Sequence, residues 1–252
     1  MKNNLYENIK TKFDICYVLT MSNRPDRQIH MDMQFNEYGW EIGTGWMNYK
    51  YATPFPYNDI IANAFNKSGK GRFTKANEYD CARNHYGIVK ECYDRGYNSV
   101  LIMEDDICFY NNMEVFNNFI DNIPEDYDII QFGGFTVDPK AKNILDAYDK
   151  GQYWVKHKDC LVWNASMYAL SRKGMEYYLA FMNKIFWVAD GPLYKAPLND
   201  KLINTYISTI PLVIQEDKHK LSSDIRNDKN DSIDYKNDNI YESRINIDDY
   251  KW

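Results

Sequence analysis

The chain has 252 residues, of which 44% are hydrophobic and 26% charged, and its formal net charge is -6 with a pI near 5.3. Its length fits one domain, and no apolar run approaches the roughly 20 residues that span a bilayer, so we expect no transmembrane segment. The acidic balance excludes a sequence-independent grip on nucleic acid, because such binding needs a surface rich in lysine and arginine.

The cysteines and the N-terminal residues indicate a cytoplasmic protein. Residues 1–12 mix Lys, Asn and Glu and lack the apolar stretch of a secretory signal. The five cysteines form no CxxC pair, which argues against a zinc site and against a disulfide framework. Peripheral attachment to a membrane and the oligomeric state stay open. We expect one domain over residues 1–226 and a polar tail, either disordered or draped on the domain, over residues 227–252.

Strand and helix patterns alternate along the chain. Short runs of β-branched and apolar residues bounded by turn residues predict strands, and apolar residues at helical spacing before a glycine predict helices. In chain order the expected elements are strand 13–20, helix 26–38, irregular segment 43–71, helix 77–95, strand 99–103, helix 113–122, strand 127–132, strand 166–170, helix 173–184 and strand 210–214. This order predicts an α/β fold with a mostly parallel mixed central sheet.

Three acidic residues, Glu104, Asp105 and Asp106, follow the expected strand 99–103 directly. Side chains alternate along an extended segment, so Glu104 and Asp106 are expected to face one way and Asp105 the other. Carboxylates at the carboxyl end of a strand suit Mg²⁺ or Mn²⁺ held together with substrate phosphates. The alternative is a solvated turn without a ligand.

Six segments, in the expected order, resemble glycosyltransferase family 25, the lipooligosaccharide and procollagen galactosyltransferase group. The residues FTKANEYDCARNH keep the Glu, Cys and His of one family motif in register, and VLIMEDDICF matches its strand followed by EDD. Asn84 stands where the family usually has Ser. The matching segments are residues 15–27, 73–85, 100–109, 127–133, 168–174 and 211–225, so the similarity runs from about residue 13 to 226.

The resemblance implies a GT-A-like fold, a UDP-sugar donor, Mn²⁺ (or Mg²⁺) and inversion at the anomeric carbon, with galactose the commonest sugar of the group. The chain would then move a sugar to a glycan or hydroxylated acceptor, as in lipopolysaccharide biosynthesis. Two other readings of the acidic cluster stay open: a nucleotidyltransferase or phosphate-cleaving enzyme, and a non-catalytic glycan-binding relative.

An inverting transferase also needs a general base near the acceptor hydroxyl, and an acid distant in sequence is the usual source. Asp190, in the turn-like sequence VADGP, is the candidate; a simple turn aspartate is the alternative. For the metal, Glu104 and Asp106 are the expected ligands, and His219 is a third candidate that could equally lie in solvent. Residues expected to contact the donor are Arg24, Arg27, Glu78, His85, Asp105 and Ser223.

Overall fold

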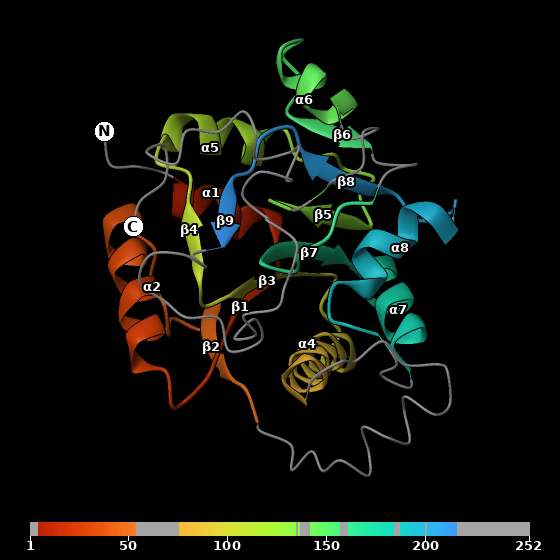
Figure 1. Cartoon of the computed structure of the whole chain (residues 1–252). Coiled ribbons are helices and arrows are strands. Elements are labelled where there is room, and N and C mark those ends of the chain that lie inside the picture. The colour runs from red at the N-terminus through yellow and green to blue at the C-terminus, as the bar shows by residue number, and fades with distance from the viewer. Residues whose placement is uncertain are drawn as a thin grey trace, which may run out of the picture.

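The structure of the chain is a computed structural model (Figure 1), and it describes residues 5–53, 76–134, 136, 142–156, 161–183, 187–199 and 201–215. Strands and helices alternate through these ranges. The strands are β1 (Ile15–Thr20), β2 (Met47–Tyr51), β3 (Ser99–Glu104), β4 (Ile107–Phe109), β5 (Ile129–Gln131), β6 (Trp154–Lys156), β7 (Met167–Ser171), β8 (Thr205–Ser208) and β9 (Val213–Gln215). The helices are α1 (Leu5–Lys12), α2 (Pro25–Tyr38), α4 (Ala76–Asp94), α5 (Met113–Asp121), α6 (Lys142–Tyr148), α7 (Arg172–Phe181) and α8 (Gly191–Asn199).

Within the described residues, a seven-stranded sheet has the order β2-β1-β3-β7-β5-β8-β6, and β4 pairs with β9 in a separate ribbon. Strands β2, β1 and β3 are parallel, and β5 is parallel to β8. Strand β7 runs antiparallel to both of its neighbours, and β6 is antiparallel to β8. Most strands of the sheet therefore point the same way, which confirms the predicted α/β class with a mostly parallel mixed sheet.

The central strands are buried on both faces. In β1, Cys16 and Val18 join the core cluster that also contains residues of α1, α2 and α5, whereas Tyr17 and Leu19 join the cluster that contains residues of α4, α7 and α8. Side chains alternate along a strand, so β1 carries apolar groups to both layers of helices. Figure 1 shows α4 and α7 on the other side of the sheet from α1 and α5. The sheet is therefore the middle one of three layers, and helices cover β1 on both of its faces.

Glycines end two helices as the sequence predicts. Gly39 follows α2 with φ +66°, and Gly96 lies just beyond α4 with φ +83°, a conformation that side chains with a Cβ adopt rarely. The expectation of a wholly irregular segment at 43–71 is wrong in part, because Met47–Tyr51 form β2 at the edge of the sheet. In β2, Met47, Tyr49 and Tyr51 alternate with Asn48 and Lys50, a pattern typical of a strand. Gly43 and Gly45, which come just before it, favour an irregular segment instead.

The sheet brings several chain segments to one edge. Strand β3 ends at Glu104, its neighbour β1 ends at Thr20, and the antiparallel β7 begins there at Met167.

No helix in the described part of the chain is long and apolar enough to cross a bilayer. The expected domain end at 226 and the tail 227–252 lie outside the described residues.

Candidate active site at the carboxyl end of β3

The three consecutive acids separate into two environments. Asp105 is buried, and its two carboxylate oxygens accept hydrogen bonds from Thr20 Oγ1 at 2.7 Å and from Arg27 Nη1 at 2.9 Å. Burial raises the pKa of Asp105, and the charge of Arg27 and the hydroxyl of Thr20 oppose that rise. Asp105 therefore points into the protein, where an equally buried arginine neutralises it.

Glu104 and Asp106 instead converge on one group. Nε2 of Gln215 lies 3.4 Å from Glu104 Oε2 and 3.2 and 3.3 Å from the two oxygens of Asp106. Gln215 is the last residue of β9 and pairs with Ile107 in β4, directly after Asp106. Gln215 was not among the predicted site residues, although it stands in the last of the family-like segments; that motif was the signal available for it.

This arrangement fits a hard divalent cation. Two carboxylates and a side-chain amide meet at a strand end, and the amide of Gln215 can be turned to present its oxygen in place of its nitrogen. Carboxylate and amide oxygens are the ligands that Mg²⁺ and Mn²⁺ prefer. Arg27 Nη1 lies 3.4 Å from Asp106 Oδ2, so its positive charge offsets part of the negative charge of the cluster.

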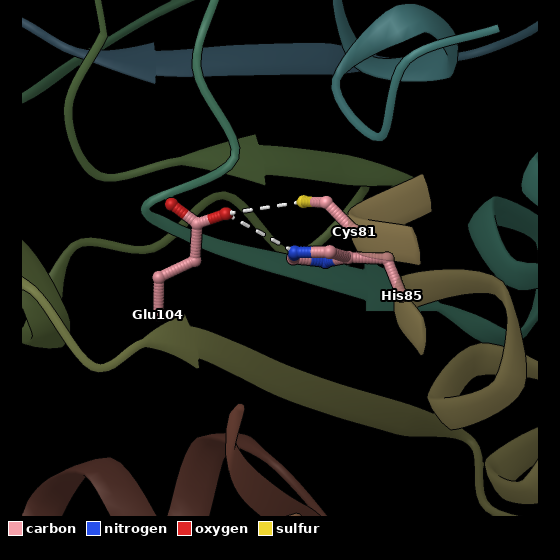
Figure 2. A group of neighbouring side chains, drawn as sticks. All are labelled: Cys81, His85 and Glu104. Atoms are coloured by element: carbon pink, nitrogen blue, oxygen red, sulfur yellow. Dashed lines mark hydrogen bonds and ion pairs between the residues drawn. The ribbon is translucent and has the colours of Figure 1, made fainter. Parts of the chain in front are cut away.

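Helix α4 supplies two more side chains to Glu104. The buried His85 places Nε2 3.2 Å from Glu104 Oε1, and Cys81, one turn earlier, places Sγ 3.8 Å from the same oxygen. Figure 2 shows both side chains directed at that oxygen while the other carboxylate oxygen points away. Burial raises the pKa of the Cys81 thiol well above its ordinary value, and Glu104 and Asp190 add to the rise.

Asp190 lies close enough to Glu104 for their charges to interact. Its pKa rises to about 6 because the carboxylate is desolvated; the backbone N–H of Asn164, which donates to Oδ2 at 3.0 Å, lowers it, and the charge of Glu104 raises it. Asp190 also precedes α8, whose Leu193 N–H donates to the Asp190 carbonyl at 2.9 Å. The residue is thus both a helix-start aspartate and a member of this cluster.

The loop that holds Asp190 in place is itself strained. Asn164 has φ +110°, an uncommon conformation for a residue other than glycine. Its side-chain oxygen accepts hydrogen bonds from the backbone and the hydroxyl of Ser166, and its carbonyl accepts one from the buried Gln131 at 3.2 Å. Strained residues that persist are held by their surroundings and are frequent at functional sites.

The remaining predicted residues are placed less centrally or not at all. Arg24 pairs with Asp26 at 2.8 Å at the start of α2, and Glu78 lies half-buried in the first turn of α4. His219 and Ser223 lie outside the described residues. The structure brings Glu104, Asp106, His85 and Asp190 together, and it joins Arg27 to Asp105.

Comparisons with solved structures give distant likenesses. One is to mannose-1-phosphate geranyltransferase from Thermus thermophilus, at 10% identity and a TM-score of 0.31 over 76% of this chain and 58% of that one. Another is to mouse xyloside xylosyltransferase 1 in its apo form, at 6% identity and a TM-score of 0.32 over 72% of this chain and 66% of that one. The chain thus spans less than two thirds of the first of these and about two thirds of the second, and likenesses of this size carry no functional argument. No curated protein matches the chain.

A family model gives the decisive comparison. The model described as glycosyltransferase family 25 (LPS biosynthesis protein) matches residues 13–190, which hold β1, β3, the acidic cluster, the Cys81 and His85 helix and Asp190. The match covers well over half of the chain and confirms the resemblance found in its motifs. The chain therefore belongs to glycosyltransferase family 25.

Proposed function

We propose that the chain is an inverting, metal-dependent glycosyltransferase that moves a sugar, galactose in the first instance, from a UDP-sugar to a glycan or hydroxylated acceptor. The observation that carries the proposal is the convergence of Glu104 and Asp106 on Gln215 at the end of β3. Family membership supports glycosyl transfer as the reaction class. We place the reaction in the cytoplasm or at a membrane surface facing it.

Glu104 and Asp106 would hold Mn²⁺ (or Mg²⁺), with the amide of Gln215 as a further ligand. Bound there, the cation would supply positive charge opposite the diphosphate as the glycosidic bond to the donor breaks. The contacts of Arg27 with Asp105 and Asp106 favour a role in orienting these carboxylates. Arg24, partly buried just before α2, is then the better candidate for the nucleotide.

Asp190 is the proposed general base. A pKa of about 6 leaves its carboxylate largely ionised at neutral pH and still basic enough to accept a proton. The acceptor hydroxyl would lose its proton to Oδ1, since Oδ2 accepts from Asn164. The hydroxyl oxygen then bonds to the anomeric carbon opposite the diphosphate, the bond to the diphosphate breaks, and UDP leaves. Glu78, His219 and Ser223 remain proposed contacts of the donor or its cation.

Release of UDP from UDP-galactose, with and without Mn²⁺, tests this function without knowledge of the acceptor. We expect Mn²⁺-dependent release by the wild type and its loss in Asp106→Asn and Glu104→Gln. Asp94→Asn is the matched control, because Asp94 is exposed on α4 and pairs with Lys90. Full activity of Asp106→Asn would overturn the assignment of the cation site. Release of pyrophosphate in place of UDP would indicate a nucleotidyltransferase.

A further inference from the structure

Three different ligand atoms meet on the side of Glu104 that faces α4. Cys81 Sγ, His85 Nε2 and a Glu104 oxygen all lie within 4.8 Å of one another (Figure 2). Ligand atoms around a tetrahedral zinc ion lie roughly 3.3 to 3.7 Å apart, given bonds of about 2.0 to 2.3 Å. The observed 3.2 Å from Nε2 to Oε1 and 3.8 Å from Sγ to Oε1 are close to those separations.

A chain of hydrogen bonds behind His85 determines which ring nitrogen carries the proton. The hydroxyl of Tyr178 donates to the Ala189 carbonyl at 2.9 Å, and a carbonyl can only accept. The Tyr178 oxygen therefore accepts from Tyr168, to which it is hydrogen-bonded. The Tyr168 oxygen is left to accept from Nδ1 of His85, 2.9 Å away.

Nε2 of the neutral His85 ring is consequently a bare acceptor, and it faces another acceptor, Oε1 of Glu104. Two acceptors in contact need a hydrogen atom or a cation between them. A proton on Nε2 would serve, and so would a metal ion. A metal ion would also take Cys81 as a ligand, because thiolate sulfur, imidazole nitrogen and carboxylate oxygen are the ligand types that zinc binds in proteins.

We propose that Cys81, His85 and Oε1 of Glu104 form a second metal site that binds Zn²⁺. Cys81 and His85 are four residues apart on α4 and so share one face of the helix. The Tyr168 hydroxyl supplies the outer hydrogen bond that ligating histidines almost always make. The lack of a CxxC pair does not bear on this site, because only one of its three ligands is a cysteine.

Glu104 would link the two sites. Its Oε1 faces Cys81 and His85, whereas its Oε2 faces Gln215. If the proposed function is correct, on which this consequence alone rests, zinc on one oxygen draws negative charge from the other and weakens Mn²⁺ binding. The second site would then act as an inhibitory zinc site beside the donor.

The test is a titration of the metal-free full chain with Co²⁺, which substitutes for zinc and gives a thiolate-to-metal absorption band, followed by calorimetry with Zn²⁺. We expect a thiolate band that corresponds to one bound ion in the wild type and in Cys92→Ala, because an ion held by Asp106 and Gln215 has no thiolate ligand. Cys92 is the matched control, since it is buried on the same helix about 16 Å further along its axis. The band should be lost in Cys81→Ala.

Two further variants keep the proposal falsifiable if Cys81→Ala folds poorly. Tyr168→Phe keeps the ring and removes the outer hydrogen bond, so Zn²⁺ affinity should fall about tenfold or more. Asp106→Asn should keep the thiolate band although it loses the proposed donor cation. The absence of a thiolate band in the wild type, or an unchanged band in Cys81→Ala, would overturn the proposal. Neither measurement needs donor or Mn²⁺, so its failure is separate from that of the proposed function.

Discussion

Replacing Asp190 with asparagine should abolish transfer and at the same time stabilise the protein at neutral pH. The pKa of Asp190 rises from 3.8 to about 6 in the folded protein because its carboxylate is desolvated. The stabilising contribution of such a group is present in full below pH 3.8 and is lost as the pH rises through about 6. A rise of this size corresponds to about 3 kcal/mol. Because the residue is partly exposed, we expect about 2 kcal/mol.

Urea unfolding of wild type and Asp190→Asn at two pH values measures this effect. Asparagine resembles the protonated acid, so the two proteins should have equal free energies of unfolding at about pH 4, and the variant should be more stable by about 2 kcal/mol at about pH 8. Donor turnover by the wild type should rise with pH through about 6 and be absent in the variant. Asp94→Asn should change neither quantity. A variant that is less stable at the higher pH would contradict the raised pKa of Asp190, and one that keeps its turnover would contradict its role as the general base.

Four further substitutions test the residues around the site. Arg27→Met leaves Asp105 buried without its counter-charge and should lower the free energy of unfolding by about 3 to 5 kcal/mol; an unchanged urea midpoint would contradict the buried pair. Gly133→Ala places a Cβ 2.2 Å from a backbone carbonyl of β9. It should therefore lower the free energy of unfolding, measured by thermal unfolding, by about 1 to 3 kcal/mol and weaken Mn²⁺ binding. Gly87→Ala has open space around its Cβ and should instead stabilise α4 by about 1 kcal/mol. Gln215→Ala should weaken Mn²⁺ binding about tenfold in a calorimetric titration with the fold intact, and equal affinity would remove it from the site.

Local patterns in the sequence predict the centre of the fold well. β1 and β3 are continuous apolar runs because both of their faces are covered, and α2 and α4 end at glycines that take a left-handed conformation. Helix α8 was not predicted, since it begins with Gly191 and contains Pro197 in its interior, and glycine and interior proline are the two residues least favourable to a helix. Its buried Leu193 and Ala196 pack into the core, so tertiary contacts decide its conformation.

The candidate site, like the fold, is predictable from the sequence only where it depends on local patterns. The acidic cluster follows from the alternation of side chains after one strand, and Asp190 follows from its own local motif. The pairing of Asp105 with Arg27 joins residues 78 positions apart, and the contact of Gln215 with Asp106 joins residues 109 apart. No local pattern specifies such contacts, because they depend on how α2 and β9 lie against the end of β3.

The most direct test of the account is UDP binding by the wild type and by Asp106→Asn, followed as a shift in thermal unfolding with and without Mn²⁺. A ligand that binds the native state raises its apparent stability in proportion to the logarithm of its concentration over Kd. We expect UDP to raise the Tm of the wild type only when Mn²⁺ is present and to leave Asp106→Asn unchanged. An equal shift without Mn²⁺, or an undiminished shift in the variant, would contradict a donor site built on Glu104 and Asp106.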